Sequence, residues 1–497
     1  MNTSYENTEA SKSDEGGGMR DERRTEGGGR KDEKEKSDSS PMPHPSSLIS
    51  SPIPHPSSFD SLSPPDPKII DTCVHCGFCL STCPSYRVIG KEMDSPRGRI
   101  YLMDGVNEGE IPLSPTTVQH FDSCLGCLAC VTTCPSGVRY DKLIESTRQQ
   151  VERHHERSLP EKLLRQLIFS TFPYPNRMRW MLRPLGIYQK SGLQKWVRSL
   201  DFLKHLSSQL GAMEAMLPAI PAQAFQDTLP DLIPAQGNQR YRVGLILGCV
   251  QRLFNPEVNN ATVQVLTANG CEVVIPPSQG CCAALTHHQG QEEQTKTLAR
   301  QMIDTFADAG VDYVLVNASG CGHTLKEYGN ILGNDPQYSE KAQAFANQVR
   351  DVQEFLADVG LTVPLSPLQD EPLTLVYQDA CHMLHGQKIS VQPRQLLKQI
   401  PGVRLREPVD AALCCGSAGV YNILQPEVAE ELGRQKAENL TNTGASVIAS
   451  ANIGCFVQIS RHLKLQGKNV PVLHPVQLLD YSIRGIPLQD SGITNSL

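Results

Sequence analysis

The second half of the chain alternates short apolar runs with longer amphipathic stretches. Residues 243–247 are VGLIL and residues 313–316 are YVLV, whereas residues 292–310 space their apolar side chains three and four positions apart. Uninterrupted apolar runs of this length are typical of strands buried on both faces, and the longer spacing is typical of helices that pack along one side. The alternation predicts parallel sheets covered by helices, so the overall fold class is α/β.

This alternation occurs twice in the same order. Each copy contains a strand, a cysteine, a helix, a strand, a Cys-Cys pair, a long helix, a strand, a further cysteine and a helix. The copies span 238–365 and 366–497, and we predict two repeated cysteine-rich domains that could form a pseudo-twofold pair with a cleft between them. The cysteines, in this order, are Cys249, Cys281, Cys282 and Cys321, then Cys381, Cys414, Cys415 and Cys455.

These eight cysteines lie where strands end or helices begin, which are the positions at which α/β folds bind ligands. A single such cysteine is usually a core residue, as we expect for Cys271. Four per copy in one order favour a metal or cluster site in at least one copy, because sulfur is a soft ligand. Nearby histidines are candidates for proton handling or quinone contact, or are core and surface residues: His287, His288, His323, His382 and His385. We expect His474 to be structural.

The N-terminal region has a very different composition. It is rich in Gly, Ser, Glu, Lys and Arg, and SSPMPHPSS at 39–47 is nearly repeated as SSPIPHPSS at 50–58. Such a segment cannot bury enough apolar surface to offset its conformational entropy. We therefore predict a disordered tail and an extended Pro/Ser linker over 1–66.

Between these regions, one cysteine pattern occurs twice. CVHCGFCLSTCP at 73–84 and CLGCLACVTTCP at 124–135 both have the spacing C-x2-C-x2-C-x3-C-P. This is the ligand spacing of ferredoxins with two 4Fe–4S clusters, in which the fourth cysteine of each run binds the other cluster. The predicted ligands are Cys73, Cys76, Cys79 and Cys134 for cluster 1, and Cys124, Cys127, Cys130 and Cys83 for cluster 2. Two zinc sites are the alternative. A zinc site needs only four ligands in two pairs, so zinc does not explain two identical four-cysteine runs that each end in proline.

The cysteine runs define a small α-helical module over 67–155, followed by a helical connector over 156–237 that ends in a proline-rich stretch. Between the two runs, the Ser-Pro pair at 95–96 is a typical helix start, because proline fits the first turn of a helix. Arg97 and Arg99 follow this pair, and they could offset the negative charge of reduced clusters or be solvated.

Length and composition limit both the number of domains and the class of protein. A chain of 497 residues is too long for one core, and we expect about three folded units. The formal charge of −7 and the lack of a basic stripe argue against nucleic-acid binding. Sixteen of the seventeen cysteines belong to these patterns and no signal peptide precedes them, which indicates a reducing, cytoplasmic compartment.

Hydropathy gives no transmembrane segment, because no stretch reaches eighteen uncharged apolar residues. Residues 172–188 mix aromatic side chains with Arg177, Arg179 and Arg183. Arginine side chains can reach water both from a protein surface and from a membrane surface. This segment could therefore pack against the core or a partner, or lie peripherally on the cytoplasmic membrane face.

Five stretches of the motif regions are distinctive: CVHCGFCLSTCPSY, DSPRGRIYLM, CLGCLACVTTCPSGV, LCCGSAGVYNI and NIGC. Over about 67–485, the chain resembles the glycolate oxidase iron–sulfur subunit family. It is broadly similar to the iron–sulfur subunits of lactate oxidation complexes, of anaerobic glycerol-3-phosphate dehydrogenase and of heterodisulfide reductase. Two features depart from the wider Cys-Cys-Gly pattern, because neither copy ends in C-x-x-C and the first copy has Cys-Cys-Ala.

The resemblance implies a division of labour between subunits. A partner subunit that carries FAD would oxidise glycolate to glyoxylate, and this chain would pass single electrons through its two clusters to a quinone or another acceptor, not to oxygen directly. No catalytic residue is then expected here, and no flavin or nicotinamide fingerprint occurs. Two alternatives stay open: the same role with D-lactate or another 2-hydroxy acid, and a non-catalytic redox sensor or cluster-stabilised scaffold.

Overall fold

The computed structural model describes residues 59–199, 214, 220–225, 227 and 229–490. The predicted disordered tail therefore lies outside the described residues as far as 58. The end of the predicted linker contacts the cluster module, since Phe59 packs on its core and Asp60 forms an ion pair with Arg153 at 3.0 Å.

The cluster module is a group of short helices around one apolar core. Its elements are α1 (Pro67–Ile70), α2 (Pro84–Ile89), η1 (Glu92–Asp94), α3 (Pro96–Asn107), α4 (Pro115–Asp122), α5 (Ala129–Thr133) and α6 (Tyr140–His154). The predicted Ser-Pro start is the start of α3, where the Ser95 hydroxyl accepts a hydrogen bond from Gly98 N at 3.1 Å. Proline also opens α1, α2 and α4, where its missing N–H costs nothing.

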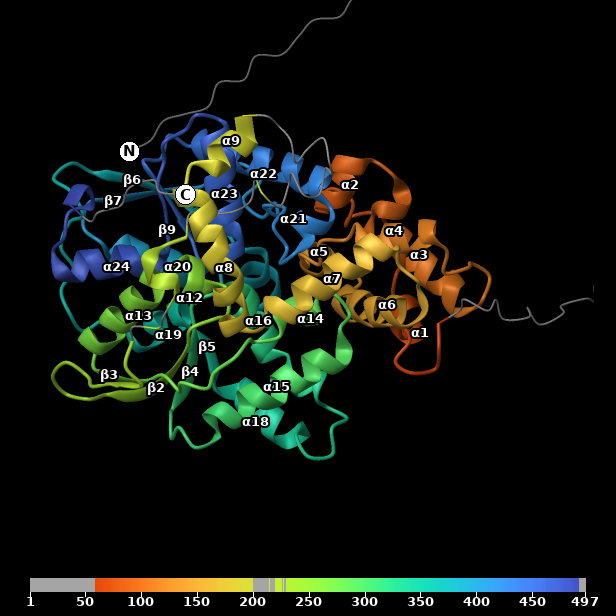
Figure 1. Ribbon diagram of the computed structural model, residues 1–497, viewed down its shortest axis with the longest axis horizontal. Coiled ribbons are helices and arrows are strands. Elements are labelled where there is room, and N and C mark those ends of the chain that lie inside the picture. The colour runs from red at the N-terminus through yellow and green to blue at the C-terminus, as the bar shows by residue number, and fades with distance from the viewer. Residues whose placement is uncertain (1–58, 200–213, 215–219, 226, 228, 491–497) are drawn as a thin grey trace, which may run out of the picture. The chain divides into compact units, whose positions relative to one another are not determined.

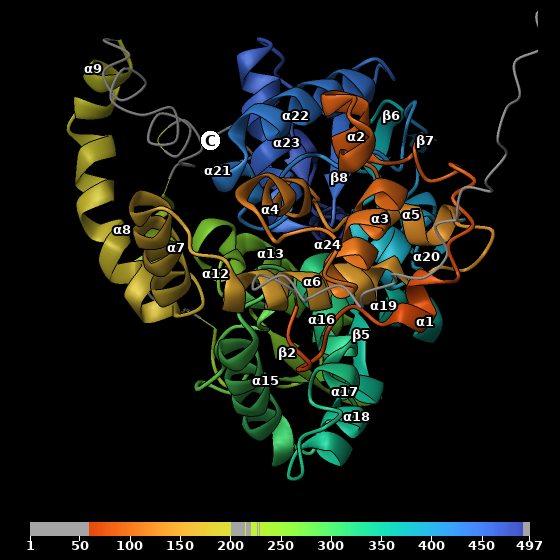
Figure 2. The ribbon, with the colours of Figure 1, turned by 90° about the vertical axis from the view of Figure 1, so that its right-hand side faces the viewer.

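The connector is helical where it is described. It contains α7 (Leu159–Thr171), α8 (Pro175–Lys190), α9 (Leu193–Ser199) and η2 (Ala222–Phe225), and Figure 2 shows α7 beside α8 at the left of that view. At its predicted proline-rich end, Pro218 lies outside the described residues, whereas Pro221, Pro230 and Pro234 are described. No helix in the described part of the chain is long and apolar enough to cross a bilayer.

The first repeated domain is built on a mixed sheet. Among the described residues, its strands are β1 (Leu232–Ile233), β2 (Tyr241–Ile246), β3 (Cys271–Val274), β4 (Tyr313–Val316) and β5 (Val349–Asp351), in the order β1-β3-β2-β4-β5. All neighbours pair in parallel except β1 with β3. The helices are α12 (Gln251–Phe254), α13 (Pro256–Ala268), α14 (Ala284–His287), α15 (Glu292–Ala307), α16 (Ser319–Lys326), α17 (Tyr328–Ile331), α18 (Ser339–Gln348) and α19 (Val352–Val359).

The second domain repeats this topology. Its described strands are β6 (Leu373–Gln378), β7 (Val403–Arg406), β8 (Val447–Ser450) and β9 (Val472–Leu473), all parallel, in the order β7-β6-β8-β9. This matches β3-β2-β4-β5, so the prediction of two repeated α/β domains with parallel sheets is confirmed. The helices are η3 (His382–Gly386), α20 (Val391–Gln399), α21 (Tyr421–Leu424), α22 (Pro426–Thr441), α23 (Ile453–Leu465), α24 (Pro475–Arg484) and η4 (Leu488–Asp490).

The two domains pack through equivalent helices (Figure 1). The first long helix of each copy contacts the last helix of the other copy, because α13 packs on α24 and α20 packs on α19. One apolar core runs through both sheets and these four helices. The reciprocal packing is the arrangement of a pseudo-twofold pair, and it fixes how the carboxyl ends of the two sheets face each other.

Candidate iron–sulfur sites and a shared thiol cavity

The two ferredoxin-type loops have the same backbone conformation. His75 and Gly77, two and four residues after the first cysteine of their loop, have φ of 51° and 85°. Gly126 and Leu128 occupy the same positions in the second loop, with φ of 63° and 64°. Left-handed residues at alternate positions turn successive N–H groups toward one side, which is the arrangement that binds anions. Both loops are therefore shaped to surround a negatively charged cluster.

Four cysteines line a small cavity of about 30 Å³ beside the first loop. Cys73, Cys76 and Cys79 come from that loop, and Cys134 comes from the end of the second run. This is the crossed set expected for cluster 1. Arg97 lines the same cavity, and its Nη1 donates to the carbonyl of His75 at 2.8 Å.

The predicted set for cluster 2 is also gathered in one place. Cys124, Cys127, Cys130 and Cys83 are all buried. Burial and the neighbouring thiols of Cys127, Cys124 and Cys83 raise the pKa of Cys130, so the crossed cysteine belongs to this group electrostatically. Gly126 N donates to Cys124 Sγ at 3.4 Å, a backbone contact of the kind that tunes cluster potential.

Two guanidinium groups lie behind the second loop. Arg99 is completely buried, and its Nη2 donates to the hydroxyls of Ser85 and Ser123 at 3.0 and 2.8 Å. Arg148 donates to the carbonyl of Cys124. Burial raises the pKa of Cys124, but the charges of Arg99 and Arg148 outweigh this and lower it. Arg99 is therefore a buried positive charge beside the cysteines predicted to bind cluster 2, and the alternative that it is solvated is wrong.

The two cluster sites differ in their access to solvent. Cys76 is exposed, and the adjacent side chains of Val74 and Phe78 are 68% and 65% exposed. In contrast, Cys124, Cys127 and Cys130 are each at most 9% exposed. Site 1 thus faces outward and site 2 faces the rest of the chain.

The eight cysteines of the repeated domains line one cavity of about 140 Å³. In the first domain, Cys249 Sγ lies 3.4 Å from Cys281 Sγ, and in the second, Cys415 Sγ lies 3.2 Å from Cys455 Sγ. Cys249 and Cys381 follow the ends of β2 and β6, Cys321 and Cys455 lie in the first turns of α16 and α23, and the Cys-Cys pairs lie in the loops after β3 and β7. The two sets therefore meet beyond the carboxyl ends of the strands. Cys124 of the second ferredoxin loop lines the same cavity.

Each thiol set has one sulfur that favours the thiolate. Hydrogen bonds from Cys281 and Cys321 lower the pKa of Cys282, and hydrogen bonds from Cys414 and Cys455 lower that of Cys415. Three further soft sulfur donors beside one anionic sulfur in each set suit a thiophilic metal or a cluster. Such a group would draw protons from the remaining thiols on binding.

Cys-Cys-Ala and Cys-Cys-Gly have the same local geometry. Ala283 has φ of 64° and Gly416 has φ of 83°, both directly after their Cys-Cys pair. The first copy therefore keeps the turn that normally favours glycine, although a left-handed alanine is strained. The departure from the wider pattern does not change the placement of its cysteines.

Three polar residues at these sites had not been singled out from the sequence. Arg148 lies on α6 and Glu145 one turn before it, where no local motif marks them. Lys436 is buried beside Cys415 and donates to the carbonyl of Ala411 at 2.7 Å. This lysine falls on the apolar face of α22, and a charge in such a stripe is a signal that sequence inspection can find.

Four histidines surround the junction between the cluster module and the repeated domains. His382 Nε2 lies 2.9 Å from the carbonyl of Gly126, and the His288 ring lies 4.7 Å from the His382 ring between centroids. Burial lowers the pKa of His382 to about 3 and also lowers that of His288, so both rings are neutral at physiological pH. His323 stacks near His288, whereas His385 contacts Thr132.

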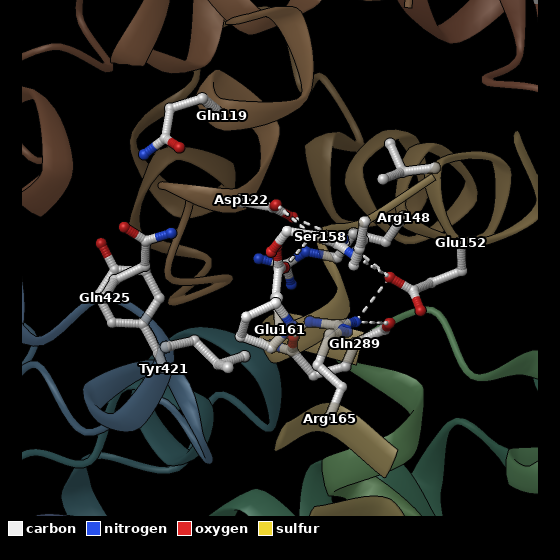
Figure 3. Close-up of a pocket in the computed structure, with 14 residues that line it drawn as sticks. Gln119, Asp122, Arg148, Glu152, Ser158, Glu161, Arg165, Gln289, Tyr421 and Gln425 are labelled. Carbon is white, nitrogen blue, oxygen red and sulfur yellow. Dashed lines mark hydrogen bonds and ion pairs between the residues drawn. The ribbon is translucent and has the colours of Figure 1, made fainter. Parts of the chain in front are cut away.

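A polar pocket of about 270 Å³ lies beside this junction (Figure 3). Arg157 pairs with Asp122, Glu152 and Glu161, and Arg165 donates to Glu152 at 2.7 Å. The charges in the pocket neutralise one another, so this network of ion pairs holds the module and the connector together.

Two residues expected to be structural have structural positions. Cys271 lies in β3, and His474 is the N-cap of α24.

Comparison with known proteins agrees with this layout. The 4Fe-4S dicluster domain family matches residues 69–138, the linker region of the glycolate oxidase iron-sulfur subunit matches 160–217, and the cysteine-rich domain family matches 243–326 and 375–460.

Two relatives match this chain over most of its length, and a third matches about half of it. The probable glycolate oxidase iron-sulfur subunit of Bacillus subtilis (strain 168) is 39% identical over 82% of this chain and 92% of its own length. The glycolate oxidase iron-sulfur subunit of Escherichia coli (strain K12) is 35% identical over 84% and 95%. Lactate utilization protein A of Shouchella clausii (strain KSM-K16) is 31% identical over 48% of this chain and 98% of its own. This chain therefore belongs to the glycolate oxidase iron–sulfur subunit family.

Proposed function

We propose that this chain is the electron-transfer subunit of a complex that oxidises glycolate to glyoxylate with an acceptor other than oxygen. A partner subunit with FAD would take two electrons from the C2 carbon of glycolate, and two protons would be released. The bound 4Fe–4S clusters would supply one-electron carriers between that partner and a quinone or another acceptor. No residue of this chain needs to contact glycolate.

The gradient of exposure at the cysteine sites is the observation that carries this proposal. Cys73, Cys76, Cys79 and Cys134 would hold cluster 1 at the surface, where the exposed side chains of Val74 and Phe78 offer an apolar contact for the flavin partner. The buried set would hold cluster 2: Cys124, Cys127, Cys130 and Cys83. In this proposal the exposed cluster 1 would accept electrons from the partner, and the buried cluster 2 would receive them from cluster 1.

The path would continue into the thiol cavity. Cys124 lies both in the predicted ligand set of cluster 2 and on the wall of this cavity. Its carbonyl and that of His288 both accept hydrogen bonds from Arg148, which ties the two regions together. We propose that a further metal or cluster is bound there by the cysteines of at least one repeated domain, next in line after cluster 2.

The proposal is tested by substrate-driven cluster reduction. The full chain is purified anaerobically with its flavoprotein partner, glycolate or D-lactate is added separately, and the clusters are followed by EPR. We expect reduction by glycolate; faster reduction by D-lactate would instead assign the role to a 2-hydroxy-acid complex of the lactate type. Clusters that dithionite reduces but neither substrate reduces would overturn the proposal and support a redox sensor or scaffold.

A further inference from the structure

Three metal-ligating side chains meet outside all the cysteine sets. Glu145 comes from α6 of the cluster module, and His287 and His288 come from the end of α14 in the first repeated domain. One carboxylate oxygen and one ring nitrogen from each histidine all lie within 4.8 Å of one another. The group is formed by packing between two regions and has no counterpart in a local sequence motif.

The two histidines differ in their polar partners. His287 Nε2 lies 3.1 Å from Glu145 Oε1 and pairs with it when the ring is protonated, whereas His288 Nε2 has no partner among the described residues. Both histidines are buried or nearly so, and a buried polar atom without a partner costs about 1 to 3 kcal/mol. A ligand that both nitrogens can bind would remove this cost.

We propose that Glu145, His287 and His288 form a binding site for a divalent transition-metal ion, with Zn²⁺ as the best-suited species. Two imidazoles and one carboxylate with a free fourth position form a common ligand set for zinc. The set contains no sulfur, so its ligand atoms differ from those of the cysteine sites, although His288 also lines the thiol cavity. Bond lengths of about 2.0 to 2.2 Å would require rotations of these side chains that bring the ligand atoms closer together.

An ion pair between Glu145 and a protonated His287 is the competing explanation. That pair leaves His288 Nε2 without a partner, whereas a metal ion uses it. The bound ion would also fasten α6 to α14 next to Arg148, whose Nη1 donates to the carbonyl of His288 at 2.8 Å. The ion would therefore stiffen the contact between the module and the first repeated domain.

Metal content and ligand type test the proposal together. The full chain with its clusters is isolated anaerobically from zinc-supplemented cultures and dialysed, and zinc is measured by mass spectrometry and X-ray absorption at the zinc edge. We expect about one zinc per chain with nitrogen and oxygen neighbours near 2.0 to 2.1 Å. His288→Gln and Glu145→Gln should each lower the retained zinc at least about tenfold while the iron content stays unchanged. His155→Gln, on a histidine outside the group, should retain it.

Three results would overturn the site. Zinc could be absent from the parent protein, or it could have sulfur neighbours near 2.3 Å, which would place it among the cysteines. It could also persist in both variants with unchanged neighbours. Unchanged iron content and circular dichroism establish that each variant is folded. Because no substrate is added, the outcome is independent of whether glycolate reduces the clusters.

Discussion

At the scale of single residues, backbone conformation marks the cysteine sites as clearly as the cysteines do. His75, Leu128 and Ala283 carry a side chain in the left-handed region, each within two residues of a motif cysteine. Such residues cost about 1 to 2 kcal/mol each, and they persist where a site requires them. The sequence alone reveals only the glycines at equivalent positions, because nothing in the letters His, Leu or Ala indicates a positive φ.

The two residues that follow the Cys-Cys pairs should respond in opposite ways to substitution. Ala283→Gly relieves left-handed strain and should leave the melting temperature unchanged or raise it, by an amount that corresponds to about 1 kcal/mol or less. Gly416→Ala should lower it, with a cost of about 2 kcal/mol or more, because the added Cβ would lie 2.7 Å from the Ala429 carbonyl of α22. Anaerobic calorimetry measures both; equal shifts would contradict this difference.

Crossed ligation makes a sharp prediction for the ferredoxin-type cysteines. Cys134→Ser should remove the same EPR signal as Cys76→Ser, although the two residues belong to different runs. Cys83→Ser should remove the other signal, together with roughly half of the cluster iron in each case. If Cys134→Ser and Cys127→Ser instead remove the same signal and spare the other, each run binds its own cluster and the crossed assignment fails.

At the scale of elements, the sequence predicts the long helices and the central strands, but not the short strands at the edges of the sheets. Buried strands such as β2 and β6 and the long helices follow directly from apolar spacing. The strands β5 and β9 have three and two residues, too few for a periodic pattern, and β1 is a two-residue antiparallel addition. Hydrogen bonds to a neighbouring strand create these elements, and that neighbour is distant in sequence.

The cap of α19 gives the molecule a pH-dependent element. Asp351 accepts a hydrogen bond from Gln353 N at 2.8 Å, but its Oδ2 has no hydrogen-bond partner among the described residues. Burial raises the pKa of Asp351 from 3.8 to about 7. Between these values only the folded state binds the proton, so the free energy of unfolding falls as pH rises toward 7, by an amount on the order of 2 to 4 kcal/mol.

Asp351→Asn should remove this dependence. The amide keeps the oxygen that caps α19 and carries no charge, so the variant should be less pH-sensitive between about pH 4 and 7 and more stable than the parent above pH 7. Denaturant midpoints across this range provide the measurement. Asp66→Asn, at the exposed cap of α1, is the matched control and should follow the parent. A variant that loses stability at every pH would show that the carboxylate itself is needed.

At the scale of the whole molecule, packing joins sites that the sequence keeps apart. Repeat order correctly groups the cysteines within each copy, but it cannot tell that both groups line one cavity with Cys124. The contacts that accomplish this, such as Tyr421 Oη with the Ser123 carbonyl at 3.1 Å and His382 with Gly126, join positions more than 250 residues apart. No local pattern encodes such pairs, because each depends on the docking of complete domains.

The exposed face at site 1 provides a test of the proposed electron exchange with a flavin subunit. If the flavin subunit docks over Val74 and Phe78, replacing both with Ser removes apolar contact area worth about 1.5 to 3 kcal/mol per side chain. Glycolate-driven cluster reduction at limiting partner should then slow by about tenfold or more, since each 1.4 kcal/mol is a factor of about ten in affinity. Reduction by dithionite and the iron content should not change. Leu465→Ser, on an equally exposed apolar residue of α23, is the matched control and should reduce at the parental rate. Equal rates for the double variant and the parent would place the docking surface elsewhere and remove site 1 as the entry point for electrons.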